Sequence, residues 1–288
     1  MSYKRVGVVT GANKGIGLAI VRQLALQYPK SPLNNGPLLI YLTARDKGRG
    51  EAALKDLYED PRLKKAKALS SDGGLSEIRY HALDIGDSQS ISTFADYLKK
   101  THGDGVDFVI NNAGIAMQGF DTNVVKGTLA INYYGTLEAC HASIPLLKPN
   151  GRIANVASMA GHLSRYSDEV RKQFLASKTE DDVTKIMKKF ASAVEEGKEK
   201  EAGFPSAAYA VSQAGLIGAT RALALAEKEK GGSVLINSCC PGWVVTDMTK
   251  GKGHKTPDQG AQTPVLLAIG DIKDKSGTFW QDEKEVEW

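Results

Sequence analysis

Short apolar runs alternate along the chain with longer amphipathic stretches. The apolar runs cover residues 5–10, 38–43, 78–83, 106–111, 152–157 and 234–239. Between them, residues 15–28, 88–100 and 206–230 carry apolar side chains at helical spacing. Short, almost wholly apolar strands that alternate with helices are typical of a parallel sheet covered on both faces. With right-handed crossovers, the pattern predicts an α/β fold with a doubly wound parallel sheet of the Rossmann type.

Residues 162–205 differ from the rest of the chain in charge. They hold nine basic and nine acidic residues, so that 18 of 44 are charged, about 41% against 24% for the whole chain. Apolar residues recur within the segment at helical spacing. These are Val183, Ile186, Met187, Phe190 and Val194. We interpret the segment as an inserted pair of surface helices within a single domain covering residues 1–288; a charged linker is the alternative.

The composition limits the class of protein. A 42% hydrophobic content over 288 residues excludes wholesale disorder, and the chain has no run of 18 apolar residues that would predict a membrane span. The net charge is only +4 and bases are interleaved with acids, so no nucleic-acid partner is expected. Three cysteines (Cys140, Cys239 and Cys240) and the absence of a signal peptide favour a reducing, cytoplasmic location. The histidines are scattered, so no metal site is expected.

A glycine-rich turn joins the first predicted strand to the first predicted helix. It reads TGANKGIG and includes Gly11, Asn13, Lys14, Gly15, Ile16 and Gly17. The glycines permit a tight turn and a close approach of the backbone to a pyrophosphate. The start of the helix supplies free N–H groups and the positive end of the helix dipole. The turn therefore predicts a dinucleotide cofactor.

The glycine spacing, G-x-x-x-G-x-G, resembles the short-chain dehydrogenase/reductase family. Three further motifs follow in the family's order: NNAG at 111–114, ASMAG at 157–161 and PG at 241–242. The words TGANKGIGLAIV, LTARD, NNAGIA, INYYGT, CCPGWVVTDM and EVEW resemble the monomeric carbonyl reductases. So does the long separation between Ser158 and Tyr209, which are 51 positions apart. The resemblance implies a monomer that reduces aldehydes, ketones or quinones with NADPH.

The end of the second predicted strand indicates which dinucleotide is used. Arg45 stands at the tip that faces the adenine ribose, and Lys14 can approach the same position. Two cations there would pair with a 2′-phosphate, which predicts NADP(H). The adjacent Asp46 keeps NAD(H) open as the minority interpretation, and both cations could instead be ordinary surface charges.

The resemblance implies further contacts with the cofactor. Asp84 and Ile85 would bracket the adenine, although Asp84 could instead cap the following helix, a role for which Asp87 and Ser88 also compete. The other implied cofactor contacts are Asn111, Asn112, Ala113, Gly114, Tyr209, Gln213, Pro241, Gly242, Val244, Val245 and Thr246.

The catalytic group implied by the resemblance is Asn132, Ser158, Tyr209 and the residue four positions after the tyrosine. In the family, serine and tyrosine contact the carbonyl oxygen, the tyrosine donates the proton, and asparagine orders a water molecule in the relay. A lysine normally lowers the pKa of the tyrosine, but Gln213 occupies that position and the chain has no other Tyr-x-x-x-Lys. Glutamine can bind ribose hydroxyls but carries no charge, so we expect a tyrosine pKa near the ordinary ~10 and an impaired reaction.

Three interpretations of Gln213 stay open. It could be an engineered substitution, a natural residue that slows or retunes the reaction, or the mark of a protein that binds cofactor without turnover. The last corresponds to a different function, a non-catalytic NADP(H)-binding protein with a redox-sensing or regulatory role.

The substrate pocket is expected beyond the carboxyl ends of the strands. Its predicted lining is mostly apolar and comprises Met117, Ser158, Met159, Tyr209, Trp243 and the loop 244–255. Trp243 could alternatively only pack under that loop, and Cys239 and Cys240 could be packed apolar residues or a reactive thiol. The insertion directly precedes the tyrosine helix, so we expect it to cover that helix and leave a monomer.

Overall fold

One eight-stranded sheet organises residues 3–288, which the computed structural model describes. The strands are β1 (Arg5–Val9), β2 (Leu38–Ala44), β3 (Ser76–Ala82), β4 (Val106–Asn111), β5 (Leu147–Val156), β6 (Leu235–Cys240), β7 (Phe279–Gln281) and β8 (Lys284–Val286). Their order is β3-β2-β1-β4-β5-β6-β7-β8, and all neighbours are parallel except β7 and β8. The predicted doubly wound parallel sheet is confirmed, and the two short strands at its edge were not predicted.

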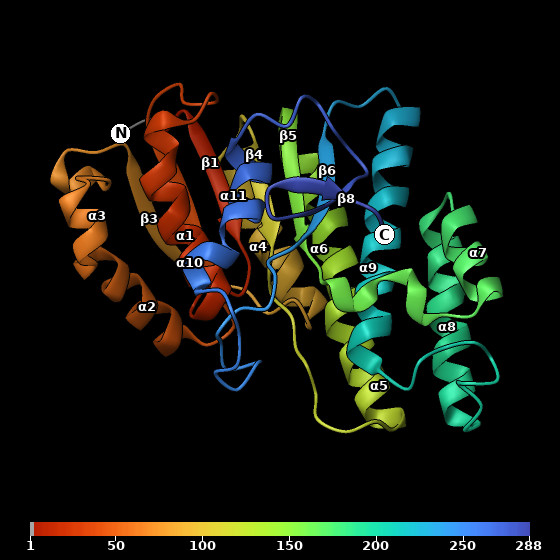
Figure 1. The fold of residues 1–288 in the computed structure, drawn as a ribbon. Helices are drawn as coiled ribbons and strands as arrows, with labels where there is room; N and C mark the ends of the chain where they lie inside the picture. Colours follow the sequence, from red (N-terminus) through yellow and green to blue (C-terminus); the bar gives the residue numbers. More distant parts are fainter. Residues whose placement is uncertain (1–2) are drawn as a thin grey trace.

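Helices cover both faces of the sheet (Figure 1). One face carries α1 (Gly15–Gln27), α2 (Lys47–Glu59), α3 (Pro61–Lys65), α10 (Pro257–Gly260) and α11 (Gln262–Ile269). The other carries α4 (Ser88–Thr101), α5 (Thr122–Leu129), the π-helix η3 (Ala130–Gly135), α6 (Thr136–Ser143) and α9 (Ala208–Glu229). Short 3₁₀ helices are η1 (Tyr28–Lys30), η2 (Ser70–Asp72), η4 (Ile144–Leu146), η5 (Met159–Gly161) and η6 (Leu163–Arg165).

The predicted insertion forms two helices, α7 (Asp168–Ala176) and α8 (Glu180–Glu195), which lie outside α9 in Figure 1. Of the apolar residues that the spacing singled out, Val183, Ile186, Met187 and Phe190 are buried in α8 and Val194 is half-buried. Tyr133 of η3 and Met187 of α8 both pack against Gly215 of α9, where a Cβ would lie 3.0 Å from the Tyr133 ring and 2.5 Å from the Met187 sulfur. The glycine therefore lets the insertion lie directly on α9.

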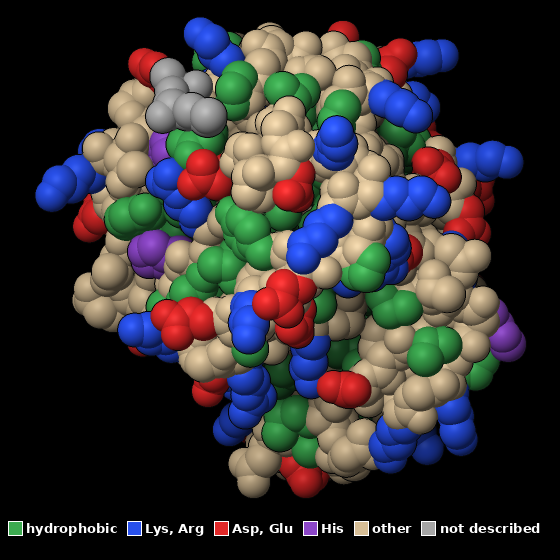
Figure 2. Space-filling view, turned by 90° about the vertical axis from the view of Figure 1, so that its left-hand side faces the viewer, with side chains coloured by type: hydrophobic (Ala, Val, Ile, Leu, Met, Phe, Trp, Pro, Cys, Tyr) green, Lys and Arg blue, Asp and Glu red, His purple; other side chains and the backbone are tan. Residues whose placement is uncertain are grey.

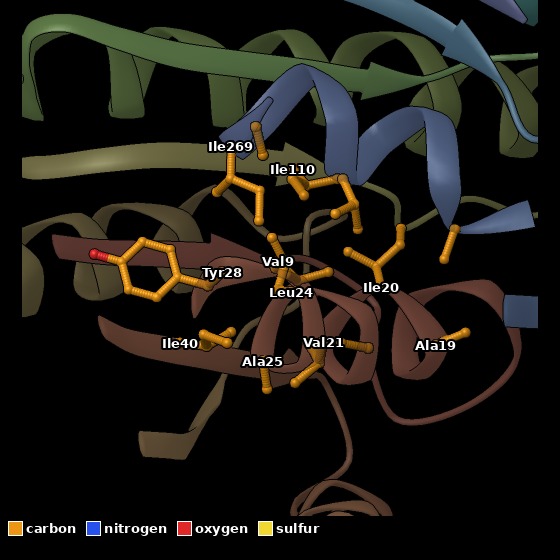
Figure 3. Packing of buried hydrophobic residues seen from close by; sticks show 14 of the residues in the cluster. Val9, Ala19, Ile20, Val21, Leu24, Ala25, Tyr28, Ile40, Ile110 and Ile269 are labelled. Carbon is orange, nitrogen blue, oxygen red and sulfur yellow. The ribbon is translucent and has the colours of Figure 1, made fainter. Parts of the chain in front are cut away.

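The helix that follows the glycine-rich turn packs on the sheet through an apolar cluster. Val21 and Leu24 of α1 are fully buried, and Leu24 lies beside Val9 of β1 in a cluster that also contains Ile40 of β2 and Ile110 of β4 (Figure 3). Burying an aliphatic side chain of this size contributes about 1.5–3 kcal/mol. The start of α1 is thereby fixed beside the carboxyl ends of β1 and β4, where the order of the strands reverses. Ligands of doubly wound sheets bind in the crevice at such a point.

The surface mixes both signs of charge. On the face that Figure 2 shows, Lys and Arg side chains are interspersed with Asp and Glu, as they are along the chain. Within residues 3–288, no helix combines the length and the apolar character needed to cross a membrane.

Candidate active site

The turn between β1 and α1 is built so that only glycine fits at two of its positions. Gly11 has a φ of +62°, in the left-handed region, and a Cβ there would lie 2.7 Å from the Cα of Ala113. A Cβ on Gly17 would lie 2.4 Å from the Gly11 carbonyl oxygen. The turn thus folds tightly against the end of β4 and presents backbone rather than side chains.

Hydrogen bonds join this turn to the NNAG segment. The Thr10 hydroxyl accepts from the backbone N–H groups of Asn112 and Ala113, both at 3.0 Å. The Asn112 amide donates to the carbonyls of Thr10 and Gly11, at 2.9 and 3.1 Å. Asn111 differs, because its side chain faces the core and donates to Asn155 at 2.9 Å. A cofactor contact by Asn111 would therefore have to come from its backbone.

The two predicted phosphate-binding cations lie on the exposed rim of the site. Lys14 forms an ion pair of 2.6 Å with Asp247, and this contact lowers the pKa of the aspartate. Arg45 is exposed and forms no ion pair within residues 3–288. The Asp46 carboxylate accepts from the backbone N–H of Arg49 at 2.8 Å and so caps α2. Asp46 is the residue that kept NAD(H) open as an interpretation. One of its carboxylate oxygens is thus engaged in capping α2.

Asp84 does not cap the next helix. The cap of α4 is Asp87, which accepts from the backbone N–H of Gln89 at 2.9 Å. The Asp84 side chain instead accepts from the backbone N–H of Gly86 at 2.9 Å, and its backbone N–H donates to Ser90. These contacts fix the loop after β3, and the capping alternative for Asp84 is wrong.

Tyr209 and Gln213 lie one turn apart in the first half of α9. Gln213 is 4% exposed, and its amide oxygen Oε1 is buried with no hydrogen-bond partner among residues 3–288. An orphaned buried acceptor costs about 1–3 kcal/mol. The position is therefore one where a bound molecule that donates a hydrogen bond would be stabilised.

The phenol of Tyr209 is a weaker acid than the sequence predicted. Burial raises its pKa to about 12, the neighbouring Ser158 hydroxyl has an opposite and smaller effect, and Cys240 raises the pKa further. The expected value near the ordinary ~10 is wrong, because it allowed for the missing cation but not for the desolvation of the phenol.

Ser158 lies two residues after the end of β5, and its turn rests on the tyrosine helix. The serine hydroxyl accepts from the backbone N–H of Ala160 at 3.1 Å and so caps η5. A Cβ on Gly161 would lie 2.5 Å from the backbone nitrogen of Ala214 in α9. The backbone of the serine turn at Gly161 and the backbone of α9 at Ala214 are therefore in close contact. This contact limits how near Ser158 can lie to the helix that carries Tyr209.

Asn132 lies in the π-helix η3, a distortion that often occurs at functional sites. Its amide pairs with both backbone groups of Ile115, each at 2.8 Å, and also donates to the Ser212 hydroxyl at 3.1 Å. Ser212 in turn donates to the Tyr209 carbonyl at 2.8 Å. Both N–H donors of Asn132 are therefore used in joining the segment after NNAG to α9.

Exposed apolar side chains mark the predicted substrate side. Met117 and Trp243 are 44% and 54% exposed. The Trp243 ring meets the ring of His254, a residue of the loop, edge-on with centroids 4.9 Å apart, and more than half of its side chain stays exposed. The Lys250 ammonium donates a hydrogen bond of 3.3 Å to the side-chain oxygen of Gln118. This bond joins the loop after β6 to the segment that follows NNAG. Met159 is partly buried beside Cys240.

Cys239 and Cys240 are both buried at the end of β6. Burial raises the pKa of the Cys239 thiol well above its ordinary value. This environment favours the apolar packing role over a reactive thiolate for Cys239. Within residues 3–288, no group of His, Cys, Asp and Glu side chains is placed to hold a metal ion.

Three residues of the site carried no clear signal in the sequence. Ser212 accepts a hydrogen bond from Asn132, and Trp288 donates one to the carbonyl of Gly161. Both partners lie far away in the sequence. Asp247 lies within the loop predicted to line the pocket, but its pairing with Lys14 joins positions 233 residues apart. Sequence spacing carries no information on such pairs.

Comparisons with known proteins agree with this geometry. The family model described as "short chain dehydrogenase" matches residues 5–179. Carbonyl reductase [NADPH] 1 of Macaca fascicularis is 39% identical over 295 residues, covering 99% of this chain and 98% of that protein. Carbonyl reductase [NADPH] 3 of Rattus norvegicus is 38% identical and covers 100% of this chain and 99% of that protein.

A solved structure gives the same result in three dimensions. Salutaridine reductase from Papaver somniferum has a TM-score of 0.81 at 26% identity, covering 96% of this chain and 99% of that one. The fold, the order of the motifs and the full-length similarity lead to one conclusion: the chain is an oxidoreductase that belongs to the short-chain dehydrogenase family.

Proposed function

We propose that this protein reduces aldehydes, ketones or quinones to alcohols with NADPH, with Tyr209 as the proton donor. The observation that carries the proposal is the packing of the Ser158 turn on α9, the helix that carries Tyr209. The oxygen of Gln213 that has no partner among residues 3–288 supports it, because a bound cofactor could donate to that oxygen. The carbonyl reductases named above, which cover nearly the full chain, support the reaction class and the choice of NADP(H).

The residues of the site fit a bound dinucleotide. The glycine turn offers backbone at close range for the pyrophosphate, and the orphaned Oε1 of Gln213 would accept a hydrogen bond from a ribose hydroxyl. Arg45 and Lys14 would hold the 2′-phosphate, for which Lys14 exchanges its ion pair with Asp247. When bound, the nicotinamide supplies the hydride.

Tyr209 and Ser158 would both act on the carbonyl oxygen of the substrate. The Tyr209 phenol stays neutral at physiological pH, because burial raises its pKa to about 12, and it can therefore donate its proton as negative charge develops on that oxygen. The Ser158 hydroxyl donates a second hydrogen bond. Asn132 positions α9 through Ser212. A proton donor with so high a pKa is a weak acid, so we expect slow reduction.

The substrate class follows from the apolar rim. Met117, Met159 and Trp243 would contact the carbon skeleton of the substrate, which leaves the carbonyl as its one polar anchor. This arrangement suits apolar carbonyl compounds of varied shape.

A non-catalytic NADP(H) sensor is the second candidate, and Gln213 is the observation that favours it. Turnover of a carbonyl substrate and binding of NADPH are measured for this chain and for Gln213→Lys. The proposal expects slow reduction in this chain and a gain of at least about tenfold with lysine. Tight NADPH binding with no turnover in either protein would establish the sensor and reject the reductase.

A further inference from the structure

Trp288 occupies a junction that none of the catalytic roles explains. Its indole N–H donates to the carbonyl of Gly161, the last residue of the serine turn, at 3.2 Å. A Cβ on Gly218 of α9 would lie 3.0 Å from the far ring atom Cη2 of Trp288. The indole therefore touches both the turn that carries Ser158 and the helix that carries Tyr209.

The insertion closes the other side of the indole. The Phe174 ring of α7 meets it edge-on, with ring centroids 5.5 Å apart. The Arg221 guanidinium of α9 lies 5.2 Å from the centroid of the indole, in a cation–π arrangement. Burial lowers the pKa of Arg221, as expected for a guanidinium held against apolar surroundings. The indole is thus in contact with Gly218, Phe174 and Arg221, and its N–H is hydrogen-bonded to Gly161.

Other contacts also hold the serine turn: the backbone N–H of Ala157 donates to the Cys239 carbonyl at 2.7 Å, and Met159 packs against the cluster that includes Leu216 and Ile217 of α9. The turn's own hydrogen bonds, from Ala160 to the Ser158 side chain and from Gly161 to the Ser158 carbonyl, are internal to it. The glycine contact with Ala214 prevents the turn from moving closer to α9 but not from moving away. The hydrogen bond from Trp288 adds a side-chain restraint at the last residue of the turn, on the side that faces the insertion.

We infer that Trp288 is a positioning residue for the reductase reaction: it holds the Ser158 turn against the Tyr209 helix. The inference rests on the proposed function, since it concerns the alignment of the two side chains that would act on the carbonyl oxygen. A displacement of about 1 Å between reacting groups lowers a rate by about 100-fold. Loosening this junction should thus lower kcat while the distant cofactor-phosphate contacts remain intact.

Trp288→Phe and Trp288→Ala test the inference, with Trp280→Phe as the matched control. Trp280 also donates its indole N–H, to Thr278 at 2.6 Å, but it packs in the core beneath α11 and does not touch the serine turn. Three quantities are measured for each protein, and for each change combined with Gln213→Lys: kcat and KM, the affinity for NADPH, and hydrogen exchange of the segment 156–166.

We expect kcat to fall about threefold in Trp288→Phe and about tenfold or more in Trp288→Ala, with unchanged NADPH affinity and faster exchange in 156–166. Trp280→Phe should leave kcat and that exchange unchanged even where it lowers Tm. Equal losses in Trp288→Phe and Trp280→Phe, or unchanged exchange in 156–166, would overturn the inference. The exchange measurement needs no turnover, so absence of reductase activity would reject the proposed function and still leave this contact tested.

Discussion

Burial decides how acidic the Tyr209 phenol is, and the neighbouring Gln213 supplies no charge to oppose it. Burial raises the pKa of the phenol to about 12, and a glutamine cannot offset that shift because it carries no charge. At pH 8 only about one phenol in ten thousand is then ionised. The neutral form dominates, which is the form that reduction requires and the form that alcohol oxidation cannot use as a base.

The pH dependence of alcohol oxidation follows from this pKa. In this chain the rate should rise about tenfold per pH unit from pH 7 to pH 10, because the tyrosinate that accepts the proton becomes more abundant. In Gln213→Lys the nearby cation should move the rise about 1–3 pH units lower. Oxidation rates across this range, with Gln213→Met as the neutral control, check the prediction. Identical profiles for lysine and methionine would contradict it.

Asn132 should contribute strongly to stability as well as to the site. Asn132→Ala removes the partners of both backbone groups of Ile115, which should lower the free energy of unfolding by about 2–4 kcal/mol. Asn123 lies exposed on the preceding helix, so Asn123→Ala should change it by less than about 0.5 kcal/mol. Urea unfolding of both variants measures the difference. Similar stabilities would show that Ile115 finds other partners.

Sequence motifs predicted which residues form the site but not how each is held. The pairing of Asn132 with Ile115 depends on the π-helix η3, and nothing in the local sequence predicts that extra backbone width. The pKa of Tyr209 depends on burial by segments from across the chain. Both are tertiary effects.

At the scale of elements, the turn after β1 and the end of β2 should select the cofactor. Arg45→Asp places a carboxylate where the 2′-phosphate is expected, so NADPH affinity should fall about 10- to 100-fold while NADH affinity stays the same or rises. Titration calorimetry with NADPH, NADH and 2′,5′-ADP measures this. Lys47→Ala, which removes an exposed cation two residues away in the sequence, serves as the control.

The cofactor prediction has a clear contrary outcome. Equal affinity of the unmodified chain for NADPH and NADH would mean that neither Arg45 nor Lys14 binds the phosphate. In that case the ion pair between Lys14 and Asp247 would be only a surface contact.

Elements with a clear repeating pattern could be predicted, and very short ones could not. Strands β1 to β6 and helices α1, α4 and α9 lie within a few residues of their predicted bounds, except that β5 begins five residues earlier. Strands β7 and β8 have three residues each, too few for an apolar pattern to be distinguished from a loop. Strand β7 pairs in parallel with β6, and β8 pairs antiparallel with β7, so both strands depend on contacts between distant parts of the chain.

At the scale of the whole molecule, we predict a monomer. The insertion packs on α9 through Met187 and Val183, over a helix that otherwise would present small residues such as Gly215 and Gly218 to a second subunit. Light scattering of the purified protein should give a mass near 30.9 kDa at all concentrations tested. A stable dimer or tetramer would show that the insertion does not block association.

The fold of the whole chain followed from its sequence because strand and helix patterns alternate in one consistent order. The location of the protein stays a prediction: its three cysteines are free and buried, which suits a reducing, cytoplasmic environment. The net charge of +4 did not predict the phosphate-binding site. That prediction depended on the positions of Lys14 and Arg45 in the sequence.

Whether Tyr209 gives its proton to a carbonyl substrate can be measured in a single turnover. NADPH bound to an excess of the protein is mixed with an aryl ketone, and the loss of NADPH and the alcohol formed are followed together. The account predicts slow, stoichiometric conversion in this chain, faster conversion in Gln213→Lys, and a rate at least about 100-fold lower in Tyr209→Phe with unchanged NADPH affinity. An equally fast reaction in Tyr209→Phe, or no alcohol from either this chain or Gln213→Lys, would contradict it.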